Sequence, residues 1–402
     1  MSSIAILILH KSKRSSDYYK WLSTVDEDIC LLSAHLHPEE KAHYTIAKQV
    51  SNDLSSSILD EVEECLVDNN IRKIIALAEE DILRAAQLRE RLGIQGQNVE
   101  SAYAFRNKVQ MKTLVSNQGI ACPQFAAVRS FTDVIDFTRK AGFPFVFKPV
   151  DGFGGMRTVV VQTEQDLHSL KADYEDTDLT GYMVEAFVDG EMYSVNGIAL
   201  EGSIVFSSVN KYSNSCLFYQ ESEPDYLVMT VPEQDPCFLR TLDFTQRVLD
   251  ALPTPEVLAF HCELFVSGDE ITFCEIASRP PGGWISESIY YSHGFDIKEA
   301  FVKLECGVET AVNYHKPVTL SAVLYVPKYQ GKLVKQLEAF PFEWVKQYIR
   351  VAETGAWYES AAHSTDVIGA IVYVGDTVEQ LQERSVILKQ FCNEQVHWEF
   401  ST

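Results

Sequence analysis

Lys148 stands in the apolar run FVFKPV and is followed by the glycine-rich segment DGFGGMR. A charged amine on a buried strand is costly unless it meets an anion or reaches water. Gly152, Gly154 and Gly155 lack side chains, so the backbone N–H groups of this turn can approach a ligand closely and hold phosphate oxygens. Taken alone, the segment is described equally well as a hairpin whose lysine reaches solvent.

Two further segments carry carboxylates at turns. Glu185 and Glu191 flank Asp189–Gly190 in MVEAFVDGEMYSV. They can accept hydrogen bonds from an amine or from ribose hydroxyls, although solvated acids of a hairpin are the simpler interpretation. Glu263 and Glu275 lie near the ends of two apolar runs joined by the turn SGDE. A hairpin there would direct both carboxylates toward one space, and magnesium prefers such oxygen ligands.

Arg279 follows Glu275 by four residues and precedes the turn PPGG in FCEIASRPPGG. An anion-binding cation therefore stands beside a carboxylate pair of metal-ligand type. His261 precedes Glu263 by two residues, so the two side chains face the same side of a strand. A hydrogen-bonded core histidine is the more frequent case, and support of a metal ligand is the alternative.

The hydrophobic pattern predicts the elements that position these residues. An α/β alternation opens the chain, with strands at 3–9 and 71–78 and helices at 54–68 and 80–92. Later helices are predicted at 106–118, 131–141 and 238–250, and largely antiparallel strands at 145–150, 158–162, 182–187, 193–199, 203–209, 257–266 and 270–276. The C-terminal part is predicted to contain strands at 319–326 and 367–374 and a helix at 377–391. Residues 212–236 have weak periodicity and two prolines, which favours a mobile loop.

Composition narrows the classes of protein. The 402 residues are too many for one ordinary core, and a net charge of −23 argues against nucleic acid or an anionic membrane as partner. Nine single cysteines without a CxxC pair argue against a zinc site. No GxGxxG or GxxxxGK[ST] motif supplies a phosphate loop of the Rossmann or P-loop kind. The N-terminal apolar run precedes its positive charges, opposite to a signal peptide, so a cytoplasmic location is expected.

In order and spacing, the residues of 105–310 resemble the ATP-grasp superfamily. The resemblance implies an α/β and α+β protein with the ATP-grasp fold. It implies an N-terminal Rossmann-like pre-ATP-grasp domain at 1–104, an ATP-grasp domain at 105–312 and a small C-terminal α+β domain at 313–402. The nucleotide is expected between the two subdomains of the ATP-grasp domain.

The resemblance also implies a set of nucleotide-binding residues. These are Lys108 and Lys148 for the phosphates, Gly152, Gly154, Gly155 and Met156 in the loop, Glu185, Phe187 and Val188 for the adenine, Glu191 for the ribose, and His261 at a polar position of the active site.

Metal binding and catalysis are likewise implied by the resemblance. Glu263 and Glu275 match the carboxylates that bind Mg²⁺, for which Mn²⁺ is an expected substitute. Arg279 resembles the arginine that contacts the transferred phosphate, and Lys148 shares its catalytic role. Ala277 stands where the family commonly has Asn, so the resemblance does not decide between one magnesium ion and two.

The strings EIASRPPGG and SAVLYVP through GAIVYVGDT resemble bacilysin-type L-amino acid ligases and carnosine-synthase-like enzymes. This implies ATP-dependent amide or peptide bond formation through an acyl-phosphate, with release of ADP and phosphate. Small carboxylates and amines, amino acids foremost, are the implied substrates; a carrier-protein thiol is another acceptor, and a homodimer is an allowed assembly. The loop at 212–236 would act as a lid.

Two alternatives stay open. The string EIA-x-RP also resembles carboxyaminoimidazole ribonucleotide synthase, which implies a carboxylase acting through carboxyphosphate. A nucleotide-binding protein without catalysis is the other alternative, and the presence of Glu263, Glu275 and Arg279 together weighs against it.

Overall fold

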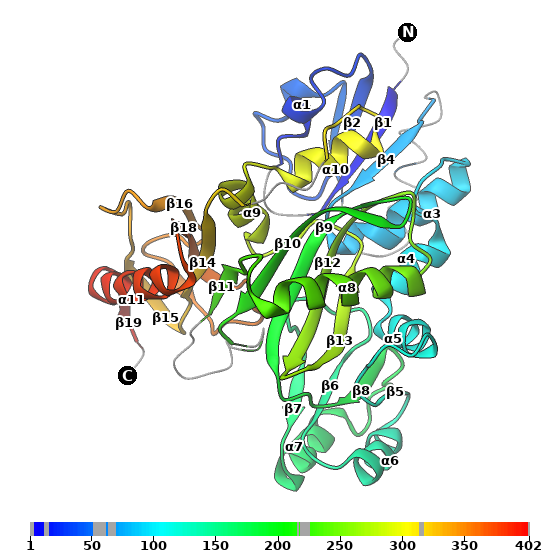
Figure 1. Ribbon diagram of the computed structural model, residues 1–402, viewed down its shortest axis with the longest axis vertical. Helices are drawn as coiled ribbons and strands as arrows, with labels where there is room; N and C mark the ends of the chain where they lie inside the picture. The colour runs from blue at the N-terminus through cyan, green and yellow to red at the C-terminus, as the bar shows by residue number, and fades with distance from the viewer. Residues whose placement is uncertain are drawn as a thin grey trace.

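The computed structural model describes residues 4–11, 16–50, 62, 70–214, 217, 226–312 and 317–400. Apart from residue 62, the predicted helix at 54–68 lies outside this part of the chain. The described residues form four sheets. Figure 1 shows the N-terminal sheet at the top, a small sheet with two helices at the bottom and the C-terminal strands at the left.

The N-terminal sheet is parallel, as the buried apolar runs predict. Its order is β3-β2-β1-β4, with β1 at Ile4–His10, β2 at Asp28–Ser33, β3 at Ile46–Gln49 and β4 at Lys73–Ala76. The predicted helix at 80–92 is observed as α3 (Ile82–Leu92), which ends at Gly93 in the left-handed region that favours glycine. Helix α10 (Ile297–Glu305) comes from far along the chain and buries Val302 against this sheet. A short helix, α1 (Tyr18–Trp21), contacts α10.

The small sheet is antiparallel and has the order β5-β8-β6-β7. Its strands are β5 (Phe125–Val128), β6 (Phe145–Pro149), β7 (Val159–Val161) and β8 (Tyr182–Ala186). Helix α6 (Phe131–Ala141) has the predicted bounds, starts at a capping box and packs with α7 (Glu164–Tyr174) on the core of this sheet. The β6–β7 hairpin confirms the predicted turn after Lys148.

The large sheet is antiparallel and has the order β13-β12-β9-β10-β11-β14-β18-β16. Its strands are β9 (Glu191–Leu200), β10 (Ser203–Tyr212), β11 (Leu227–Thr230), β12 (Val257–Ser267), β13 (Glu270–Ala277), β14 (Leu320–Pro327), β16 (Val345–Arg350) and β18 (Val367–Gly375). Helix α8 (Pro236–Ala251) packs on one face through Phe244 and Val248. Helix α9 (Ile285–His293) contacts the part of the sheet formed by β14 and β18.

The sheets differ from the prediction at two places. The strands predicted at 182–187 and 193–199 belong to different sheets, so Asp189–Gly190 joins two sheets and is no hairpin turn. The predicted loop at 212–236 contains β11, because the buried run LVMT pairs with both β10 and β14. Most of the remaining loop lies outside the described residues.

The C-terminal strands continue the large sheet beyond residue 313. β14 pairs with β11, and helix α11 (Val378–Gln395) packs on these strands. A third antiparallel sheet, of order β17-β15-β19, contains β15 (Gly331–Lys335), β17 (Trp357–Tyr358) and β19 (His397–Glu399). The domain boundary at 313 stays a prediction.

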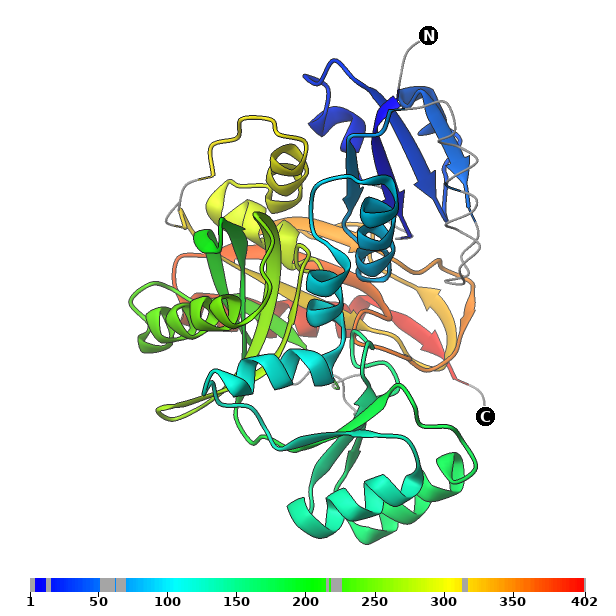
Figure 2. The ribbon, with the colours of Figure 1, turned by 90° about the vertical axis from the view of Figure 1, so that its right-hand side faces the viewer.

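Two helices link the N-terminal sheet to the rest of the molecule. They are α4 (Val99–Arg106) and α5 (Lys108–Asn117), with Asn107 capping α5. Figure 2 shows them between the blue N-terminal sheet and the small sheet. Across the described chain, no helix combines the length and apolar character needed to cross a membrane.

Candidate active site

A cleft of about 2430 Å³ lies where the small sheet, the large sheet, the N-terminal sheet and the C-terminal segment meet. This exceeds the roughly 300–1,000 Å³ of a typical small-molecule pocket, so the cleft can hold several substrates together. Most predicted site residues line it: Lys108, Lys148, Gly152, Gly154, Gly155, Glu185, Phe187, Val188, Glu191, His261, Glu263, Glu275 and Arg279. Met156 is described but is not part of this lining.

Lys148 and Glu185 form a buried ion pair on neighbouring strands of the small sheet. The Lys148 Nζ donates to Glu185 Oε1 at 2.5 Å. Burial alone would lower the pKa of Lys148, but the Glu185 carboxylate raises it above its ordinary value. Burial works against the charge of Glu185 as well, yet Lys112 and Lys148 hold the pKa of its carboxyl at about 2. Both groups are therefore charged at neutral pH.

The second oxygen of Glu185 is an open acceptor. Oε2 lies 3.2 Å from the Nζ of Lys112, an ionic contact without hydrogen-bond geometry. This buried atom has no hydrogen-bond partner among the described residues. Glu185 lines the cleft beside the half-exposed Phe187, and its Oε2 still requires a hydrogen-bond donor that the described residues do not supply. Glu191, the predicted ribose carboxylate, pairs with Lys211 at 2.6 Å and is exposed.

The glycine loop is held from two sides. Gly154 and Gly155 have φ values of 60° and 73°, a backbone conformation that favours glycine. The Lys108 Nζ donates to the Gly152 carbonyl at 2.5 Å, and the Ser364 N–H donates to the Gly154 carbonyl at 2.9 Å. The turn predicted from its glycines thus lies between α5 and the C-terminal segment, with backbone groups facing the cleft.

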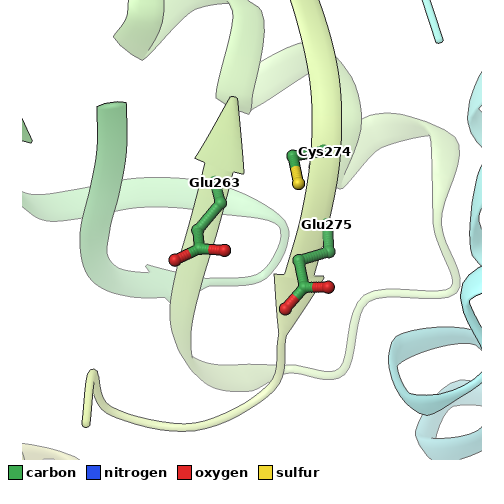
Figure 3. A group of neighbouring side chains, drawn as sticks. All are labelled: Glu263, Cys274 and Glu275. Atoms are coloured by element: carbon green, nitrogen blue, oxygen red, sulfur yellow. The ribbon is translucent and has the colours of Figure 1, made fainter. Parts of the chain in front are cut away.

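Glu263 and Glu275 lie directly opposite each other on β12 and β13. The register shifts after Glu263, so Cys274 is the extra residue of a β-bulge. Figure 3 shows the carboxylates of Glu263 and Glu275 side by side with the Cys274 sulfur next to them, and one ligand atom of each lies within 4.8 Å of the others. The bulge explains why consecutive residues share one side of the strand.

The donor set suits a hard divalent cation. Burial disfavours the charge of Glu275, but the Lys108 Nζ, 3.2 Å away, lowers the pKa of its carboxyl. Burial raises the pKa of the Cys274 thiol to about 12, so it stays protonated and is a poor ligand for magnesium. Two carboxylates then remain as oxygen ligands, the number that magnesium commonly takes from a protein.

His261 lies on the same side of β12 as Glu263, as its spacing predicts, and contacts it. The His261 Nε2 lies 3.2 Å from Glu263 Oε1, and its Nδ1 lies 2.6 Å from Asn196 Oδ1. The Tyr212 hydroxyl donates to the same Glu263 oxygen at 3.2 Å. Sequence reasoning placed the histidine but missed Asn196 and Tyr212, which come from the adjacent strands β9 and β10.

Arg279 is held by an acid that sequence reasoning missed. Its Nε donates to Glu79, which also binds Arg106 through Oε1 at 2.5 Å. Burial opposes the charge of Glu79, but Arg279 and Arg106 bring the pKa of its carboxyl to about 2. Arg106 also donates to the Asp151 carbonyl at 2.6 Å, at the start of the glycine loop. The sequence did contain a signal for Glu79: it directly follows the strand predicted at 71–78, and ligand sites of parallel sheets lie at the carboxyl ends of their strands.

Comparison with known proteins agrees with this geometry. Residues 113–285 match the ATP-grasp domain family. An L-arginine-specific L-amino acid ligase of Bacillus subtilis is 25% identical over 237 residues, which cover 58% of this chain and 57% of that protein. A formate-dependent phosphoribosylglycinamide formyltransferase of Nitratiruptor is 25% identical over 190 residues, covering 46% of each chain. The alignments thus span about half the length of these relatives.

Solved structures match over a greater length. The L-amino acid ligase of Bacillus licheniformis has a TM-score of 0.80 at 16% identity, covering 100% of both chains. The N5-carboxyaminoimidazole ribonucleotide synthetase of Thermotoga maritima has a TM-score of 0.70 at 14% identity, covering 98% of this chain and 100% of that one. At these identities the likeness shows the fold.

Residues 113–285 therefore carry a domain that matches the ATP-grasp family, and the chain has the ATP-grasp fold over its whole length. Within that superfamily it resembles L-amino acid ligases both in sequence and in structure. The fold and the resemblance predicted from the sequence are thereby confirmed.

Proposed function

We propose that this chain is an ATP-dependent ligase that joins a carboxylate, most simply that of an amino acid, to an amine and releases ADP and phosphate. One observation carries the proposal: two lysines, two opposed carboxylates and an arginine bound to a buried acid all line one large cleft. These are Lys108 and Lys148, Glu263 and Glu275, and Arg279 with Glu79. The similarity to L-amino acid ligases supports amino acids as substrates. We also propose the division into domains at 1–104, 105–312 and 313–402.

The nucleotide is assigned to the side of the cleft formed by the small sheet. Lys108, Lys148 and the glycine loop would neutralise and hold the phosphates of ATP, since two cations and the glycine loop converge there. The open Glu185 Oε2 would accept a hydrogen bond from the adenine amine. Glu191 is assigned to the ribose. Met156 is placed in the loop for its backbone alone.

The metal is assigned to the opposite wall. Glu263 and Glu275 would hold Mg²⁺, with Mn²⁺ as a substitute, and His261 and Lys108 would keep the two carboxylates in place. A divalent cation bound there supplies charge neutralisation for the phosphates of ATP. The thiol of Cys274 takes no part in this assignment.

The chemistry needs positioning more than a reactive side chain. A carboxylate oxygen attacks the γ-phosphorus and ADP leaves; the amine then attacks the acyl carbon and phosphate leaves. Arg279 is assigned to the substrate carboxylate and the transferred phosphoryl group, because Glu79 fixes its guanidinium in the cleft. The contact between Gly154 and Ser364 would shield the acyl-phosphate from water.

A screen of L-amino acid pairs for ATP-dependent phosphate release tests this proposal, with products identified by mass spectrometry. We expect ADP, phosphate and a dipeptide in equal amounts for at least one pair. Phosphate release without a condensed product, or none with any pair, would count against amino-acid ligation.

A carboxylase is the second candidate, and the structural likeness to N5-carboxyaminoimidazole ribonucleotide synthetase favours it. Labelled bicarbonate added to the same screen separates the two functions. ATP-dependent label in a product separated from bicarbonate at alkaline pH, where an N-carboxylated product is stable, would support the carboxylase, whereas a ligase leaves the product unlabelled.

A further inference from the structure

Lys112 is a buried cation that the assigned site does not use. Its side chain is 0% exposed. It lies one helical turn after Lys108 on α5, so both lysines share a face of the helix. The described lining of the cleft includes Lys108 and stops short of Lys112. A fully buried charge of this kind is costly unless other groups satisfy it.

The partners of Lys112 belong to two different parts of the site. Its Nζ donates to the Cys274 carbonyl at 2.6 Å and approaches the Phe273 carbonyl at 3.4 Å. The same nitrogen lies 3.2 Å from Glu185 Oε2. Lys112 therefore joins the bulge between the metal carboxylates to the acid that pairs with Lys148.

Helix α5 lies against β13 at the bulge and makes several contacts with it. The Ile276 N–H donates to the Met111 sulfur at 3.3 Å, and Lys108 contacts Glu275. The Phe273 N–H donates to the Ala121 carbonyl at 2.8 Å, just beyond the helix. A bulge interrupts the regular pairing of β12 with β13, so contacts from outside the ladder must determine its shape. Lys112 supplies the charged contact to the bulge carbonyls themselves.

We propose that Lys112 is a positioning residue for the metal carboxylates, which acts by fixing the Cys274 bulge that places Glu275 opposite Glu263. The inference rests on the proposed function, because it takes these two glutamates as the metal ligands. Removing Lys112 would free the bulge carbonyls and leave Glu185 with Lys148 alone. The metal would then bind more weakly although both of its ligands are retained.

Binding of Mn²⁺ tests the inference without requiring turnover. Mn²⁺ is titrated into the parent and Lys112→Met at a saturating concentration of a non-hydrolysable ATP analogue, bound ion is followed by electron paramagnetic resonance, and the analogue alone gives the background. Partners of metal ligands commonly change metal affinity by about 10- to 100-fold, so we expect the midpoint to rise at least about tenfold. Gln110→Met, exposed on the same helix, should leave it unchanged.

The midpoint of the Mn²⁺ titration distinguishes a positioning role of Lys112 from a role in general stability of the fold. A variant that only lowers the folded fraction binds less Mn²⁺ at an unchanged midpoint, and that result would overturn the inference. Should Lys112→Met fail to fold, Lys112→Gln is measured in the same way, since it keeps a donor for the Cys274 carbonyl and loses the charge. A parent that binds no Mn²⁺ would instead refute the metal assignment, and this inference with it.

Discussion

The two walls of the cleft differ in how their charges are neutralised. On the small sheet, Glu185 lies between Lys148 and Lys112 of α5, so two cations share one carboxylate and one positive charge is left over. On the large sheet, Glu263 and Glu275 face each other, and Lys108 is the cation that contacts Glu275. The first wall can exchange contacts for an anionic ligand, and the second has negative charge left for a cation. The difference explains why phosphates are assigned to one wall and magnesium to the other.

Arg279 lines the cleft just beyond β13, where Glu79 holds it, and its substitution should have the largest effect. Lysine keeps the charge but loses the planar fork that can bridge two anions. Loss of one transition-state contact of this kind costs roughly 2.7–4 kcal/mol, or about 100- to 1000-fold in rate. For Arg279→Lys we expect slow ADP formation in a single turnover with saturating ATP, at nearly normal ATP affinity. Arg139→Lys on exposed α6 is the control, and a rate for Arg279→Lys within a few-fold of the parent would remove this role.

Glu275→Gln tests the wall with unbalanced negative charge. The variant should fold, because glutamine keeps the size of the side chain and an oxygen acceptor for the Lys108 amine, and it should need roughly 10- to 100-fold more Mg²⁺ for activity. The measurement is initial rate against free Mg²⁺. Glu270→Gln, at the exposed start of the same strand, should behave as the parent. Equal magnesium dependence in Glu275→Gln and the parent would show that the metal binds elsewhere.

Lys148→Met tests the small-sheet wall, where positive charge is in excess. A hydrogen bond to a charged group contributes ~1.5–3 kcal/mol, so ATP affinity and turnover should both fall by about tenfold or more. Calorimetric titration with ATP measures the affinity, and Lys171→Met on exposed α7 is the control. Unchanged ATP affinity would exclude Lys148 from the phosphate site.

The smallest expected effect is on the pH dependence of stability, through the Glu185 carboxylate of the small sheet. The pKa of Glu185 is depressed from 4.5 to about 2, so its ion pairs stabilise the fold fully above pH 4.5 and progressively less as the pH falls toward 2. Glu185→Gln should therefore lose less stability than the parent between these pH values. Denaturant unfolding at pH 6, 4 and 3 measures this loss. Parallel losses in the two proteins would show that Glu185 is not the titrating group.

The sequence predicted those parts of the site whose residues lie close together in the chain. The capped helix α6, the hairpin after Lys148 and the Glu263–Glu275 pair all follow from periodicity and turns within a short stretch of chain. Glu79 and Lys112 were missed because their partners lie 200 and 162 residues away, at Arg279 and Cys274. Cys274 was missed because strict alternation would direct it away from Glu275, and only the bulge reverses that.

Oxygen transfer tests the central claim most directly. The parent is supplied with ATP and L-amino acids labelled with ¹⁸O in the carboxylate, and the released phosphate is analysed by mass spectrometry. Attack of the carboxylate on the γ-phosphorus followed by displacement by an amine leaves one labelled oxygen in phosphate and one fewer in the new amide. We predict one ¹⁸O per phosphate, formed together with the condensed product. Unlabelled phosphate would contradict an acyl-phosphate ligase.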